Sequence, residues 1–162
     1  MRTPMLLIAI CSVSGANAQS LELPPPLQID VIPEQLVTSE TPQGHLVRRF
    51  VPARQVRADE EVYYTVRIRN AGDRPIYPVV VTRPLPDNTI YVPGSAVGPA
   101  AVATFSVDGG LSFAAPEALE IRTDAGVTRK AGPQDYTHIR WELGYPLAGG
   151  ATAIARFCVT LR

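Results

Sequence analysis

Apolar and polar residues alternate over residues 61–70, EVYYTVRIRN, and this period of two is the pattern of a strand with one face in a core. One face of this segment holds Val62, Tyr64, Val66 and Ile68, and the other holds Tyr63, Thr65, Arg67 and Arg69. Two later segments repeat the pattern. Their predicted inward residues are Ile139, Trp141 and Leu143 in the first, and Ala153, Ala155, Phe157, Val159 and Leu161 in the second.

Turn residues separate these predicted strands at short intervals. Asn70-Ala71-Gly72-Asp73 offers an asparagine side chain for its own backbone and a glycine for a left-handed position. Asp108-Gly109-Gly110 joins two short apolar runs and is typical of a hairpin. Pro84 and Pro86 cannot donate to a ladder and therefore end a strand. Bends are also predicted at Pro93-Gly94 and at Leu147–Gly150.

No segment after the N-terminal region repeats apolar residues at helical spacing, and the 16 prolines leave few windows for a ten-residue helix. About seven short strands separated by turns, with one tryptophan among them, predict an all-β fold. The specific expectation is an antiparallel, immunoglobulin-like β-sandwich over residues 45–162, rather than a barrel.

Residues 1–18 have the order of a secretory signal peptide. Arg2 precedes an apolar run from Met5 to Val13, and small residues follow up to Ala16-Asn17-Ala18, after which cleavage is expected. A retained anchor needs roughly 18 or more apolar residues, about twice this run. Lipidation at Cys11 is disfavoured because Ile10 stands where a small residue is expected. The protein is therefore predicted to be exported, to the periplasm, the outer surface or the extracellular space.

Residues 19–44 are predicted to be an extended, Pro-rich tail or linker. The Pro24–Pro26 run favours a polyproline II segment, which acts as a semi-rigid spacer. The composition favours a loosely ordered linker. The alternative is that LQIDVI, residues 27–32, forms a short strand that adds an arm to the edge of a sheet.

The charges and the cysteine count exclude several classes of protein. The chain has 15 basic and 15 acidic residues, and removing Arg2 with the signal leaves 14 basic residues, so charge gives no case for nucleic acid. The exported chain keeps one cysteine, Cys158, so it has no internal disulfide and depends on its core. After cleavage no apolar run is long enough for a transmembrane helix.

The order of these motifs resembles a known family. ADEEVYYTVRIRNAGDRPIYPVVVTRPLPDNTIYVPGSA, then FSVDGGLSF, then IRWELGYPLAGGATAIARFCVTLR are similar, over about residues 46–162, to the bacterial conserved-repeat family called domain of unknown function 11. The resemblance implies an immunoglobulin-like module of exported and surface proteins. Arg83 departs from the family pattern, which often has an acidic residue there, and a single copy stands where relatives have tandem copies.

Motifs for catalysis or for a cofactor are not found, so a non-enzymatic protein without metal or cofactor is expected. His45 and His138 are the only histidines, and a zinc site needs three or four clustered ligands. The acidic residues at 59–61 fit a charged turn, and Asp108, Asp124 and Asp135 lack the spacing of a calcium loop. A glycosidase pair stays open, because paired carboxylates meet only in the fold.

Cys158 is the residue with two competing interpretations. Alternation places it with Arg156 and Thr160, on the face opposite Phe157, which favours an outward thiol and an intermolecular disulfide. The alternative, which we favour, is a small apolar residue covered by a neighbouring loop.

The expected function is that of a structural or protein-interaction module of the bacterial envelope. The partner would be an envelope protein or a second copy, bound at a sheet edge or through the N-terminal strand. Tyr63, Arg67 and Arg69 form the candidate interaction face. A carbohydrate-binding module is the alternative, with Tyr63, Tyr77, Tyr91 and Tyr145 as candidate platforms, although tyrosines in β-proteins often pair across strands.

Overall fold

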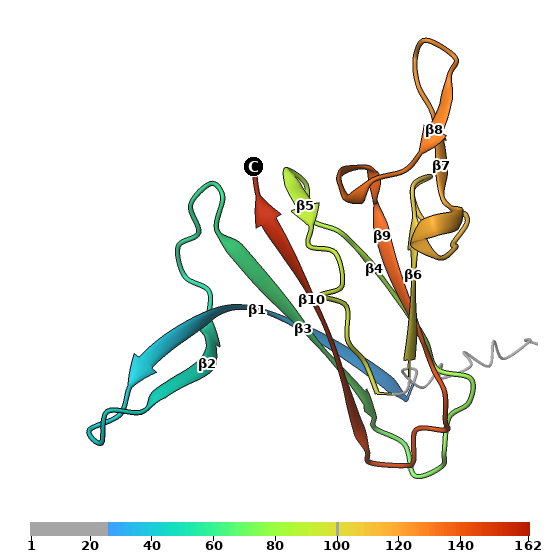
Figure 1. The fold of residues 1–162 in the computed structure, drawn as a ribbon. Helices are drawn as coiled ribbons and strands as arrows, with labels where there is room; N and C mark the ends of the chain where they lie inside the picture. The colour runs from blue at the N-terminus through green and yellow to red at the C-terminus, as the bar shows by residue number, and fades with distance from the viewer. Residues whose placement is uncertain (1–25, 100) are drawn as a thin grey trace, which may run out of the picture.

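The computed structural model describes residues 26–99 and 101–162, so the predicted signal peptide lies outside the described residues. The fold is all-β, with antiparallel sheets, as the sequence predicts (Figure 1). The larger sheet has the order β2-β1-β3-β10-β5 and the smaller sheet the order β4-β9-β6. Two short 3-10 turns, Pro116–Ala118 and Pro133–Asp135, interrupt the strands.

Residues 26–99 and 101–162 contain ten strands, more than the seven or so expected. The larger sheet contains β1 (Leu27–Glu40), β2 (Leu46–Pro52), β3 (Glu61–Asn70), β5 (Thr89–Tyr91) and β10 (Thr152–Leu161). The smaller contains β4 (Val80–Pro84), β6 (Ala101–Ser106) and β9 (His138–Leu143), while β7 (Glu120–Arg122) and β8 (Thr128–Lys130) pair with each other.

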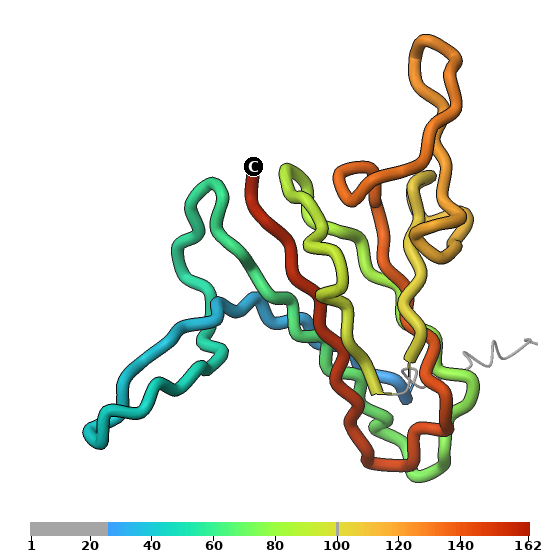
Figure 2. Tube along the Cα trace, in the orientation of Figure 1, coloured from blue at the N-terminus to red at the C-terminus, as the bar shows by residue number. Residues whose placement is uncertain are grey.

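Seven strands form the sandwich itself. Strands β1, β3, β10 and β5 face β4, β9 and β6, the four-plus-three division of an immunoglobulin constant-type domain. The order of strands in the larger sheet differs from their order in the sequence, because the last strand, β10, lies between β3 and β5. The additional strands belong to two hairpins, β1–β2 and β7–β8, which leave the sandwich on opposite sides (Figure 2).

The core lies between the two sheets and is built from the predicted inward faces. Trp141 of β9 and Phe157 of β10 are fully buried, with ring centroids 5.9 Å apart, and so join the sheets. Burial of Val62, Val66 and Ile68 confirms the predicted face of β3. At one open side of the sandwich Tyr91, Phe105 and Tyr136 pack together around an apolar cavity of about 230 Å³.

The expected loosely ordered linker over residues 19–44 is wrong for its described part, and the alternative, in which residues 27–32 form a strand added to the edge of a sheet, is observed. Strand β1 pairs with β3 from Leu27 to Glu34 and with β2 from Glu34 to Glu40. Pro33 fits this strand because its carbonyl accepts a hydrogen bond from Ala53 N–H (2.9 Å). The ladder with β2 begins only at Glu34, so the missing N–H of Pro33 interrupts no pairing.

The Asn70 turn forms as predicted, but Gly72 has a different role. Asn70 Oδ1 accepts a hydrogen bond from Gly72 N–H at 3.0 Å, and its Nδ2 donates to the carbonyls of Arg74 (2.7 Å) and Leu147 (3.0 Å). Gly72 does not have positive φ, so the predicted left-handed position is wrong. A Cβ on Gly72 would lie 3.2 Å from Pro26 Cβ and 3.3 Å from Asn70 Oδ1, so close packing in this turn favours glycine.

The other predicted turns form, but the apolar run after Asp108-Gly109-Gly110 is not a strand and meets β6 through a single bridge, Phe105–Ala114. Strand β4 ends at Pro84, and the Asp108 turn has Gly109 and Gly110 at positive φ. Gly94 and Gly150 also have positive φ, at the bend after β5 and at the turn into β10. Positive φ favours glycine at each of these turns. Arg83, the departure from the family pattern, is half-buried in β4 opposite Ile139.

Candidate interaction surface

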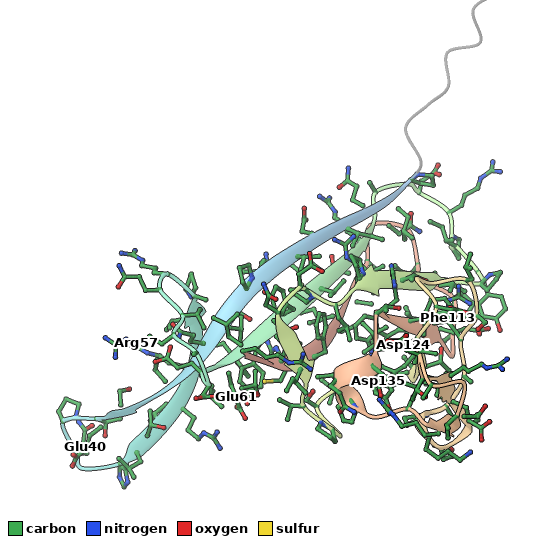
Figure 3. The ribbon with its side chains drawn as sticks, turned by 90° about the horizontal axis from the view of Figure 1, so that it is seen from above. Glu40, Arg57, Glu61, Phe113, Asp124 and Asp135 are labelled. Carbon is green, nitrogen blue, oxygen red and sulfur yellow. The ribbon has the colours of Figure 1, made fainter. Side chains whose placement is uncertain are left out.

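The β1–β2 hairpin extends beyond the sandwich. We call its projecting part, residues 34–52, the arm. Figure 3 shows Glu40 at the far end of the arm and Glu61 near its base, on the opposite side from Phe113, Asp124 and Asp135. The arm exists because β1 has 14 residues, whereas β3 pairs with it only as far as Glu34.

A cluster of side chains holds the arm against the outer face of the larger sheet. Arg156 Nε donates to Thr65 Oγ1 at 2.8 Å, and an Arg156 terminal nitrogen lies 3.5 Å from Glu34 Oε2. Thr65 Oγ1 in turn donates to Glu34 Oε2. The Arg156 guanidinium stacks 3.7 Å from the ring centroid of Phe50, an arm residue, which forms a cation–π contact. Strands β3 and β10 and the arm therefore meet at one arginine.

This cluster explains a departure from the predicted faces. Thr65 is on the outer face of β3, as alternation requires, yet it is only 4% exposed. Arg156 and Glu34 cover it. A hydroxyl buried there is satisfied by the two hydrogen bonds, so its burial has little net cost.

Replacing Arg156 with lysine should weaken the attachment of the arm to the sheet. Lysine has no planar guanidinium that can stack on Phe50 while it donates hydrogen bonds to Thr65 and Glu34. We expect Arg156→Lys to lower the free energy of unfolding by about 1–2 kcal/mol, for one lost charged hydrogen bond and one cation–π contact. Amide exchange in residues 46–52 should accelerate more than exchange in β9. Arg67→Lys, an exposed change on the same face, is the control, and equal exchange profiles for the two variants would contradict the role of Arg156.

A groove of about 310 Å³ runs between the arm and the start of β3. Its lining residues are Gln35, Leu36, Val37, Arg48, Glu60, Glu61 and Tyr63. Glu60, one of these residues, accepts hydrogen bonds from Gln35 Nε2 (3.4 Å) in the arm and from Arg57 N–H (3.0 Å). The groove thus combines charged groups of both signs with a phenol ring.

The three residues of the predicted interaction face do not share one environment. Arg67 and Arg69 are exposed on the outer face of β3, with Asp30 and Gln28 opposite them on β1. Tyr63 is half-buried and packs edge-on against Phe50, with centroids 5.1 Å apart. Tyr63 therefore belongs to the groove and the two arginines to open surface.

Cys158 lies on the predicted face, and the interpretation as a covered apolar residue is the one observed. It is 1% exposed, and the loop after β5 lies beside it, where Ser95 Oγ accepts a hydrogen bond from Cys158 N–H at 3.0 Å. Tyr63 is its neighbour on β3. In this conformation the thiol is out of reach of a second chain. Burial, aided by the Glu61 carboxylate, raises the pKa of the thiol to about 12.

Cys158 should therefore be unreactive toward an aromatic disulfide reagent at pH 8 until the protein unfolds. Its pKa is about 12 in the folded protein and near 9 in the unfolded chain, so the folded state holds the proton more tightly. The stabilisation is present below pH 9 and is lost as pH rises from about 9 toward 12. Urea unfolding across this range should show a steeper decline than in Cys158→Ala. Burial also raises the pKa of Tyr63 to about 12, so some decline remains in the variant.

The tyrosines proposed as carbohydrate platforms divide into two pairs. Tyr91 is buried in the core and Tyr63 packs under the arm. Tyr77 is 63% exposed and Tyr145 is 42% exposed, both near the Ile76–Leu147 backbone pair that closes one end of the sandwich. Of these four tyrosines, Tyr77 and Tyr145 are the two with exposed side chains.

The acidic residues considered as calcium ligands serve local turns. Asp108 accepts hydrogen bonds from Ser106 Oγ and from the hydroxyl and N–H of Ser112, and these bonds lower its pKa. Asp135 forms a two-bond pair with Arg129. Within residues 26–99 and 101–162 no group of three His, Cys, Asp or Glu could hold a metal ion. Asp59 has positive φ and lies in a turn before β3, in agreement with the charged turn predicted for residues 59–61.

The two histidines also lack ligand partners in the described part of the chain. His45 is exposed at the turn of the arm. His138 is half-buried, with Nδ1 3.2 Å from Thr137 Oγ1. Over the same residues no helix is long and apolar enough to cross a membrane.

No protein-family model, curated protein or solved structure matches the chain. The resemblance to the domain of unknown function 11 family therefore stays a prediction from the motifs quoted above. The geometry of the site has to be interpreted from its own residues.

Sequence reasoning missed the arm and its cluster. Glu34 lies in the segment predicted to be a linker and Phe50 lies after it, while alternation indicates for Arg156 only a position on the outer face of its strand. One signal was available: Leu46, Val47 and Phe50 follow the turn residues Pro42-Gln43-Gly44, which is the pattern of a hairpin's second strand.

Proposed function

We propose that this protein is an exported, non-enzymatic module of the bacterial envelope or surface that binds a protein partner through its arm. The arm carries the proposal, because it presents strand edges outside the sandwich. Beyond Glu34, the even-numbered residues of β1 point their backbone groups toward the groove, where β3 no longer pairs with them. Leu36 and Thr38 thus offer a β-augmentation edge beside charged side chains.

Three further observations support a binding role. The exposed apolar residues Leu46 and Val47 lie in β2 next to the turn of the arm, where they contribute nothing to the core. Asp108 and Asp135, which the sequence offered as candidate ligands, hold their local turns through hydrogen bonds to Ser112 N–H and Gly132 N–H. The N-terminal sequence favours export.

The test places a photo-activated cross-linking residue at Leu46 in intact cells. We expect a single adduct of defined mass, identified by mass spectrometry, and no adduct from the same residue at Leu111, which is also exposed but lies across the sandwich. Thr38→Pro should abolish the adduct, because it removes a donor that faces the groove and leaves the β1–β2 ladder intact. Equal yields at Leu46 and Leu111, or no effect of Thr38→Pro, would contradict the proposal. N-terminal sequencing should show that the exported chain begins at Gln19.

A carbohydrate-binding module is the second candidate, and the exposure of Tyr77 and Tyr145 favours it. Aromatic rings open to solvent can stack on sugar rings. A glycan array should then show binding that is lost in Tyr77→Ala and Tyr145→Ala. Val102→Ala, an equally exposed apolar change on β6, is the control.

A further inference from the structure

The first half of β1 has a second edge, distinct from the arm. Pro26 O accepts a hydrogen bond from Ala71 N–H (2.6 Å), which directs the even-numbered residues of β1 toward β3. Pro33 O accepts from Ala53 N–H, which directs the odd-numbered residues toward the side of β2. Strand β2 pairs only from Glu34 onward.

The backbone N–H and C=O groups of Leu27, Ile29 and Val31 therefore point toward a side of the sheet where the described residues place no strand. We call residues 27–32 the β1 edge. Its odd-numbered side chains are apolar and face the core. Ile29 is 37% exposed, although Ile68, its partner on β3, is fully buried. The core-facing side of the sheet is therefore still partly open to solvent at this edge.

We propose that the β1 edge pairs, antiparallel and about a two-fold axis at Ile29, with the same edge of a second copy of this chain. The inference rests on the proposed function and names one partner for it. Ile29 lies opposite Ile29 of the second copy, and Leu27 lies opposite Val31. These three pairs each exchange two backbone hydrogen bonds, and their apolar side chains cover one another.

Pro33 fits this register, because it lies two residues beyond Val31 and ends the ladder where no N–H is present. The outward N–H groups of Leu27, Ile29 and Val31 each gain an acceptor. A symmetric pairing of this kind is the commonest form of oligomer in soluble proteins.

Charge selects the same register. On the outer face, Asp30 comes opposite the neutral Gln28 of the second copy. A shift of one step in one direction sets Asp30 opposite Asp30, and like charges directly opposite each other are destabilising.

The first experiment is a cysteine cross-link in the exported full chain. Ile29→Cys places two thiols opposite each other at a Cα separation of about 5.5 Å, which is within the range for a disulfide. With oxidised glutathione as the oxidant, we expect a dimer band on a non-reducing gel. Ile154→Cys is the control, because Ile154 is 51% exposed on β10 of the same sheet but lies away from the β1 edge. Equal cross-linking of both variants would overturn the proposal.

The second experiment separates pairing from folding. Arg69 lies opposite Gln28 within the chain, and Asp30 lies opposite Gln28 across the proposed axis. Gln28→Glu should therefore stabilise the monomer slightly and weaken the dimer roughly 2- to 30-fold, since two like-charge pairs form. Gln28→Lys should act in the opposite direction on both quantities. Sedimentation equilibrium measures the dimer and urea unfolding the monomer.

The possible results are distinguishable from those of the arm experiment. A monomer at every concentration, or a dimer whose dissociation constant is equal in the two Gln28 variants, overturns pairing at the β1 edge. Adducts from Leu46 would in that case still support a partner at the arm. Dimerisation with the expected order of the Gln28 variants supports the β1 edge even if no adduct forms at Leu46.

Discussion

Replacing Gly149 with alanine is expected to cost about 3–5 kcal/mol, a large part of the stability of a domain of this size. A Cβ on Gly149 would lie 2.9 Å from Asp73 Cα and closer still to the carbonyl carbon and oxygen of Asp73. These are backbone atoms, so no side-chain rotation relieves the overlap. The turn between β9 and β10 and the turn after β3 would both have to move.

Gly150 is the matched control, because it is the next residue and its constraint is different. It has φ of +73°, and a Cβ there would meet nothing within 4 Å. Gly150→Ala should cost only about 1–2 kcal/mol, for the left-handed conformation. Urea unfolding of both variants measures the difference. Equal losses would show that contact with Asp73 is not what requires glycine at 149.

The inward faces of β3, β9 and β10 could be predicted because each strand lies between other strands and has one face in the core. Burial then forces strict alternation, and Val66, Trp141 and Phe157 follow it. The turns could be predicted for a similarly local reason. Glycine and proline constrain only their own backbone, so their effect is visible in a short window of sequence.

Strand β1 could not be predicted with the same rules, because its two halves pair on different edges. Pro33 weakens a strand prediction, yet it lies where only its carbonyl is used. Polar residues at 28, 30 and 34 look like linker composition, although Glu34 bonds Arg156 from 122 positions away in sequence. Contacts between residues so far apart in the sequence do not produce a local pattern of polar and apolar residues.

The candidate site illustrates the same limit. Alternation assigned Tyr63, Thr65, Arg67 and Arg69 to one face, and that face is correct. Whether a face is open depends on what folds over it, and the arm covers only its Tyr63 end. Cys158 is buried on this face beside Tyr63, which packs against Phe50 of the arm. Alternation predicts on which face of the sheet a side chain lies, but it does not predict whether another segment shields that side chain from solvent.

Asn70→Ala is expected to cost about 3–4 kcal/mol, the second large effect. The Asn70 side chain is fully buried, and its loss leaves the carbonyls of Arg74 and Leu147 and the N–H of Gly72 without their partner. Each buried group left unpaired costs about 1–3 kcal/mol, less where water can enter. Arg69→Ala, an exposed change one residue away, should alter stability by less than about 0.5 kcal/mol.

Asn70→Asp separates the two donated bonds from the accepted one. The carboxylate can still accept from Gly72 N–H, but it faces the carbonyl oxygens of Arg74 and Leu147 with negative charge where the amide donated. At pH 7 the loss should therefore equal or exceed that of Asn70→Ala. In acid the carboxyl gains a proton and can donate one bond, so the stability of this variant relative to Asn70→Ala should rise as pH falls from 7 to 4. Urea unfolding at the two pH values tests this, and a difference independent of pH would show that the donated bonds do not hold the two turns together.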